Sequence, residues 1–258
     1  DHPYHFESQV FEYYEYMWMG FDDDSIITSV EKIDDYTVKF NLNAPLAPYG
    51  LADTRVAHRQ AYRIAGNWKL AMEAFVEAYH VSSAHPQVLP YYGDTNTQYD
   101  VWPGVRHVSR MISVQGVPSP SMKSTPPDTT IEEMRRDVPF FGGAPIEVAA
   151  GEGARPKLAE RARQRISRST NRDLSELSDS ESLDLIEYML FPNMVPWGGQ
   201  ALPITYRFRP NGDDPETSIM EIMFLFAKAP DGSHPEPAQM RLLGRDEKWS
   251  DAPELGSA

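Results

Sequence analysis

The sequence contains no cysteine among its 258 residues. Disulfide bridges, thiolate metal sites and cysteine-ligated iron–sulfur clusters are therefore excluded within these residues. Seven histidines and 38 acidic residues are present. Any metal held by these residues must therefore be bound by imidazole and carboxylate groups.

Long apolar runs are lacking as well. No stretch approaches the ~18 residues that span a bilayer, and the opening Asp1-His2-Pro3-Tyr4 has neither the basic nor the apolar part of a signal peptide. We therefore expect a soluble, cytoplasmic chain with no membrane partner. Because 41% of the residues are hydrophobic, the chain can bury a sizeable core, as one large or two small domains.

Basic residues are few, and the net charge is −14. Nucleic-acid binding needs a basic surface that neutralises phosphates, so we expect no nucleic-acid partner. The charge is uneven, because residues 1–52 carry ten acids but only Lys32 and Lys39 as bases. This change of composition near residue 50 suggests two parts with different properties.

The first part, residues 1–52, contains one clear strand signal. Apolar side chains alternate with polar ones over residues 36–42, which predicts a strand with one apolar face. The segment includes Tyr13-Tyr14-Glu15-Tyr16 and Ala44-Pro45-Leu46-Ala47-Pro48 around this strand. It resembles a fragment of the peptide-binding proteins that serve ABC transporters. An ordinary strand with polar connections is the alternative.

The most informative run starts at Asn67, which could cap a helix. The residues from Leu70 to His80 are rich in good helix formers, so we predict a helix there. At about 100° per residue, Glu73, Glu77 and His80 would share one face of that helix.

His80 and His85 would point about 140° apart on a straight helix and could not then chelate one ion. Pro86 disfavours a helical conformation at His85, so the helix should end near Ser82 or Ser83 and let His85 return toward His80. Two histidines five residues apart are by themselves more typical of an ordinary surface or core pair than of a metal site. A zinc hydrolase is disfavoured because the His-Glu-x-x-His pattern is absent.

The run as a whole begins with Asn-Trp-Lys, continues to an acidic residue and Tyr-His, and reaches a second His after four further residues. It resembles the iron-binding segment of Rieske-type aromatic-ring-hydroxylating oxygenases. The resemblance implies that His80 and His85 bind a mononuclear Fe(II). It also implies that Glu77 is a catalytic residue that orients a histidine and links to a cluster in a neighbouring subunit, and that Tyr79 packs beside the site.

Further strands follow in the order expected of that domain, which the resemblance extends over residues 55–256. Residues 185–194 and 204–210 look like its core strands, and residues 219–226 form an apolar run that should pair with 204–209. Residues 106–114 predict another strand. The implied fold class is α+β, the helix-grip fold of the START and Bet v1 type, with an antiparallel sheet, covering helices and an incomplete C-terminus.

Parts of such an enzyme are missing from the sequence. These oxygenases bind iron with two histidines and one carboxylate, and the resemblance places that Asp beyond Ala258. The cysteine and histidine ligands of the parent family's [2Fe-2S] cluster are absent too. We therefore divide the chain into a transporter-like fragment, 1–52, and a truncated oxygenase catalytic domain, 53–258, and expect it to be inactive alone.

The resemblance implies the function of the parent enzyme. It would hydroxylate an aromatic or related apolar compound with dioxygen, take electrons from a reductase or ferredoxin, and assemble as a trimer. Two alternatives stay open: a peptide-binding component of an ABC transporter, and a non-catalytic helix-grip protein that binds an apolar ligand.

Two more patterns bear on partners and substrate. Residues 155–172 predict an arginine-rich helix, which we interpret as a solvated face, with docking of an acidic electron donor as the alternative. Five large side chains are candidates for a cavity wall, although each is more typical of a core: Trp102, Met111, Met189, Met194 and Trp197.

Overall fold

The computed structural model describes the backbone of two strands, 27–32 and 38–42, and residues 54–103, 107–122, 124–170, 173–199, 204–227 and 232–233. The strand predicted over residues 36–42 is confirmed as β2 (Val38–Leu42), which pairs antiparallel with β1 (Ile27–Lys32). The assignment of 1–52 to a transporter-like fragment otherwise lies outside the described residues, as does the predicted incomplete C-terminus. Both stay predictions.

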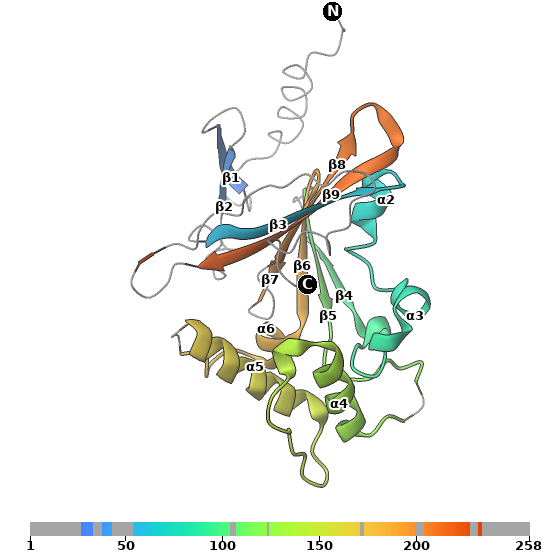
Figure 1. The fold of residues 1–258 in the computed structure, drawn as a ribbon, viewed down its shortest axis with the longest axis vertical. Helices are drawn as coiled ribbons and strands as arrows, with labels where there is room; N and C mark the ends of the chain where they lie inside the picture. Colours follow the sequence, from blue (N-terminus) through green and yellow to red (C-terminus); the bar gives the residue numbers. More distant parts are fainter. Residues whose placement is uncertain are drawn as a thin grey trace, which may run out of the picture.

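A seven-stranded sheet forms the centre of the fold (Figure 1). Its spatial order is β3-β9-β8-β7-β6-β5-β4, and all neighbouring strands run antiparallel. The strands are β3 (Thr54–Ile64), β4 (Gln98–Val101), β5 (Val108–Ser113), β6 (Leu185–Leu190), β7 (Met194–Gly198), β8 (Ile204–Asn211) and β9 (Asp214–Ala227).

The strands predicted from the sequence are confirmed as β5, β6, β8 and β9. β8 and β9 form the expected hairpin, in which Phe208 lies opposite Met220. Gly212 adopts a positive φ of 61° in the turn, a conformation that glycine tolerates without a steric cost. No helix in the described ranges is long and apolar enough to span a bilayer.

Helices cover the sheet unevenly. α2 (Trp68–Glu73) contacts β8 and β9, and α3 (Val81–Ala84) precedes the short 3-10 turns Pro86–Val88 and Asp94–Asn96. α4 (Pro127–Asp137), the 3-10 turn Pro139–Phe141, α5 (Ala154–Thr170) and α6 (Asp179–Leu183) gather at one end of the strands (Figure 1). The predicted α+β, helix-grip class is confirmed.

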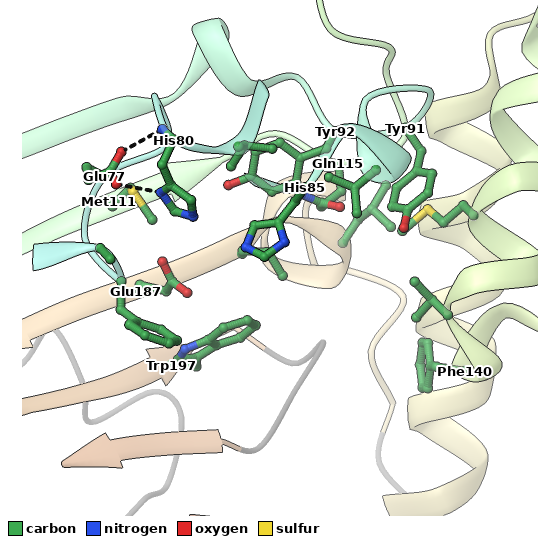
Figure 2. Close-up of a pocket in the computed structure, with 18 of the residues that line it drawn as sticks. Glu77, His80, His85, Tyr91, Tyr92, Met111, Gln115, Phe140, Glu187 and Trp197 are labelled. Atoms are coloured by element: carbon green, nitrogen blue, oxygen red, sulfur yellow. Dashed lines mark hydrogen bonds and ion pairs between the residues drawn. The ribbon is translucent and has the colours of Figure 1, made fainter. Parts of the chain in front are cut away.

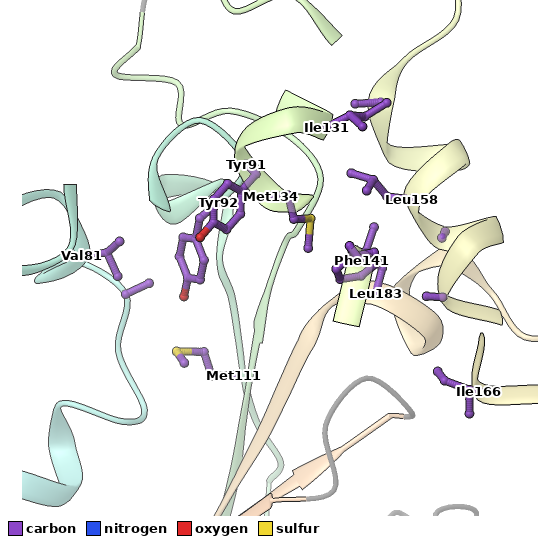
Figure 3. Close-up of a cluster of buried hydrophobic side chains, with 14 of the residues drawn as sticks. Val81, Tyr91, Tyr92, Met111, Ile131, Met134, Phe141, Leu158, Ile166 and Leu183 are labelled. Carbon is purple, nitrogen blue, oxygen red and sulfur yellow. The ribbon is translucent and has the colours of Figure 1, made fainter. Parts of the chain in front are cut away.

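Two large apolar cores hold these layers together, and a third, smaller cluster lies on β5 and β6 around Tyr188. The larger joins α4, α5 and α6 to the loop after α3, and its most buried members include Ile131, Leu158 and Leu183 (Figure 3). The second lies between α2 and the strands β7, β8 and β9, around Val195 and Phe208. Residues of both cores line one cavity.

The arginines of α5 correct one interpretation. Most of these arginines do not simply extend into solvent, because they donate hydrogen bonds that attach the helix to neighbouring segments. Arg155 donates to the buried Asp184 at 2.5 and 2.9 Å, Arg163 donates to Asp179 at 2.8 Å, and Arg161 and Arg165 donate to loop carbonyls. The predicted solvated face is therefore largely wrong, since these guanidinium groups satisfy internal acceptors.

Candidate active site

The segment that carries the histidines begins as predicted. Asn67 caps α2, because its side chain accepts a hydrogen bond from the Lys69 backbone N–H at 3.0 Å. The helix then ends at Glu73, so the prediction of a continuous helix to Ser82 is wrong. Glu73, Glu77 and His80 consequently do not share a helical face.

Tertiary contacts explain why this helix stops early. The ring of Phe75 packs on Tyr206 and Phe208 of β8, with centroid distances of 4.7 and 5.2 Å. The Ala78 backbone N–H donates to the hydroxyl of Tyr99 on β4 at 3.0 Å, in place of a helical carbonyl. Packing and a distant acceptor therefore outweigh the local helix propensity.

The bend that follows brings Glu77 onto His80 (Figure 2). Glu77 Oε1 lies 2.5 Å from His80 Nδ1, and Oε2 accepts from the His80 backbone N–H at 3.1 Å. Both carboxylate oxygens thus bind the same histidine, one at its ring and the other at its backbone. This hydrogen bond assigns the imidazole proton to Nδ1 and leaves the lone pair of Nε2 free for another partner.

His85 returns toward His80, as the proline argument predicts. Its backbone is outside the helical region, with φ −131° and ψ 49°, and Pro86 begins the next 3-10 turn. The two imidazole rings lie 5.3 Å apart between centroids and are inclined by 77°. His85 is exposed, His80 is about one-third exposed and Glu77 is nearly buried.

This arrangement fits part of an iron site. Imidazole is a common ligand for iron, and a metal-binding histidine usually donates its other N–H to a carboxylate, as His80 does. A third histidine or carboxylate does not join the pair within the part of the chain that the structure describes. Tyr79, expected beside the site, is instead 79% exposed and does not line the adjoining cavity.

A cavity of about 510 Å³ adjoins the two histidines. Its walls come from both cores and are mostly apolar and aromatic, and they include Met111 and Trp197 from the predicted wall residues. The other three candidates, Trp102, Met189 and Met194, do not line it. A volume of this size suits a small organic ligand.

Glu187 is the residue that sequence reasoning missed. It lines the same cavity from β6 and is only 4% exposed. Burial raises the pKa of its carboxyl to about 8. One signal in the sequence could have found it: Leu185, Glu187 and Met189 alternate toward one face of a strand, and the middle position of that face is acidic.

Two tyrosines of the wall are also perturbed. Burial, and after it the carboxylate of Asp137, raise the pKa of Tyr91 to about 12, and burial raises that of Tyr92. Both hydroxyls therefore stay protonated at neutral pH. The cavity is a weakly polar, low-dielectric space with two histidines at one side.

Comparison with known proteins identifies the family. Residues 51–247 match the ring hydroxylating alpha subunit, catalytic domain. The chain belongs to this family. The resemblance to Rieske-type ring-hydroxylating oxygenases is thereby confirmed, and the match does not favour a peptide-binding function for the chain.

Solved structures include a similar chain, the quaternary ammonium Rieske monooxygenase CntA in complex with an inhibitor. The identity is 13% and the TM-score 0.35, over 77% of this chain and 42% of that chain. The present chain thus spans less than half of that relative. No curated protein matches the chain.

Proposed function

We propose that the ring-hydroxylating domain described here binds a mononuclear Fe(II) and hydroxylates an aromatic or related apolar compound with dioxygen. Its electrons would come from a reductase or ferredoxin through a [2Fe-2S] cluster, which the cysteine-free chain does not itself ligate. Family membership supports the oxygenase class. Substrate, donor and a trimeric assembly are parts of the proposal.

One observation carries this proposal. Glu77 holds His80 through both carboxylate oxygens, and His85 lies beside it at the edge of an apolar cavity. A carboxylate that fixes one nitrogen of a histidine raises the basicity of the other, which favours metal ligation. The two histidines are therefore the residues that would hold iron.

Bound iron would supply dioxygen activation, a chemistry that no side chain performs alone. The chain's own residues then have three tasks. His80 and His85 hold the metal, Glu77 keeps the His80 ring in one orientation and tautomer, and the apolar wall excludes water from the ligand. A carboxylate is the usual third ligand of such a site, and none joins the two histidines within the described residues.

The first test is metal binding. Anaerobic titration with Fe(II) should give about one iron per chain for the unmodified protein, because two imidazoles and water complete a usable ligand set. Replacing both His80 and His85 by Ala should abolish binding. His58→Ala is the matched control, since His58 packs on Phe224 and neither residue lines the cavity.

Iron bound equally well by the double variant would refute the site. Tight stoichiometric Zn(II) binding together with hydrolytic activity would instead favour a hydrolase. Binding of an apolar ligand without any iron would favour the non-catalytic helix-grip alternative.

The role of Glu77 needs a separate test. In the complete enzyme, Glu77→Ala should slow electron transfer to the iron while the iron content at saturation stays nearly unchanged. The physical reason is that Glu77 positions His80 without being a ligand in its own right. Single-turnover kinetics and iron analysis of the same preparation measure both quantities, and unchanged turnover would contradict the role.

A further inference from the structure

Glu187 is part of the cavity wall. It is opposite Met111 of β5 and opposite Trp197 of β7 in the sheet register, and all three residues line the cavity. Its neighbours across the strands are therefore a thioether and an indole. An acid here has an apolar setting on both sides (Figure 2).

The carboxyl of Glu187 makes no hydrogen bond or ion pair within the described residues, and burial is the cause of its raised pKa. Burying a carboxyl group without a partner costs free energy. Glu77, the other acid of the cavity, has both oxygens engaged by His80.

The composition of the wall restricts the charge of a ligand. Neither lysine nor arginine lines the cavity in the described part of the chain. Apart from the metal that His80 and His85 would hold, a carboxylate or phosphate ligand would thus find no compensating cation beside this buried acid, which is unfavourable.

The indole of Trp197 adds a second restriction. Its Nε1–H is buried and has no hydrogen-bond partner in the part of the chain that the structure describes. An ammonium group can donate to Glu187 but cannot accept from an indole N–H. A hydroxyl group can do both.

We propose that Glu187 is a substrate-positioning residue that binds the hydroxyl group of an otherwise apolar ligand. This inference rests on the proposed function, because it takes the cavity as the substrate site. The ligand O–H donates to the Glu187 carboxyl, and its oxygen remains able to accept a hydrogen bond. The polar group then fixes one end of an apolar molecule relative to the histidines.

Four matched probes of one shape test the proposal: naphthalene, 2-naphthol, 2-naphthylmethylammonium and 2-naphthoate. Binding is measured by calorimetry at neutral pH on the full chain. We expect 2-naphthol to bind about tenfold more tightly than naphthalene, which corresponds to about 1.4 kcal/mol. We expect the ammonium and the carboxylate to bind no better than naphthalene.

Variants of Glu187 show whether the acid causes the preference. Glu187→Leu should reduce the advantage of 2-naphthol to less than about twofold, whereas Glu187→Gln should retain most of it, because an amide oxygen still accepts. Met111→Leu is the matched control on the facing strand and should change the affinity for naphthalene and 2-naphthol by the same factor. Circular dichroism of each variant verifies folding.

Equal binding of naphthalene and 2-naphthol to the unmodified chain would overturn the proposal. So would a preference for the ammonium or the carboxylate, or a 2-naphthol advantage that survives in Glu187→Leu. Iron content is measured on the same preparations. Loss of the preference with normal iron binding rejects only this inference, and absence of iron binding with the preference intact rejects only the proposed function.

Discussion

Two buried glutamates of the same sheet have opposite environments. Glu187 on β6 faces the cavity between apolar neighbours, and its pKa is about 8. Glu221 on β9 is fully buried, and although burial alone would raise its pKa, hydrogen bonds from Arg207 and Arg59 lower it to about 2. The comparison shows that pairing, and not burial alone, decides the charge of an acid in this sheet.

The surroundings of Glu221 indicate a structural role. Arg59 on β3 and Arg207 and Arg209 on β8 all form ion pairs with its carboxylate, so one acid ties three strands together. Glu187 forms no such pair within the described residues. We interpret Glu221 as a structural residue and Glu187 as a ligand-binding residue.

Glu221→Gln should have the largest effect on stability. Removing the charge leaves three guanidinium groups close together without compensation, and because they are partly exposed we expect a loss of roughly 2 kcal/mol. The free energy of unfolding from urea denaturation at neutral pH measures it. An unchanged urea midpoint would show that solvent already screens the cluster.

Glu187→Gln should stabilise the protein at alkaline pH. The folded pKa, about 8, lies above the unfolded value, so the stability that the protonated acid provides is complete below about pH 4 and is lost as the pH rises through about 8. At about pH 9 the variant should be more stable by on the order of 2 kcal/mol. Denaturation across pH measures this, and a parallel pH dependence in both proteins would contradict it.

The pH dependence of Glu221 should have the opposite sign. Its folded pKa, about 2, lies below the unfolded value, so its contribution is complete above about pH 5 and is lost as the pH falls toward about 2. Glu221→Gln should remove this acid-induced loss. Acid titration followed by circular dichroism compares the two proteins, and identical acid midpoints would argue against a paired Glu221.

The smallest effect is expected from Arg209→Gln. Arg209 makes the longest contact with Glu221, 3.3 Å, and is the most exposed of the three arginines. Exposed ion pairs contribute about 0.2–1 kcal/mol, so the urea midpoint should shift only slightly. A loss as large as that of Glu221→Gln would mean that Arg209 is essential to the cluster.

Sequence patterns predicted the features that local physics determines. Alternation and apolar runs predicted β5, β6, β8 and β9, and Asn67 and Pro86 act through their immediate neighbours. The early end of α2 was not predictable, because it depends on Tyr99 and on the packing of Phe75 against β8. The role of Glu187 was hidden for the same reason, since its cavity is assembled from segments far apart in the chain.

X-ray absorption of the Fe(II)-loaded chain tests most directly whether His80 and His85 together bind iron. We expect two imidazole ligands in the unmodified protein and in His58→Ala, and one in each of His80→Ala and His85→Ala. The same iron spectrum in all four proteins, or one without imidazole scattering, would contradict it.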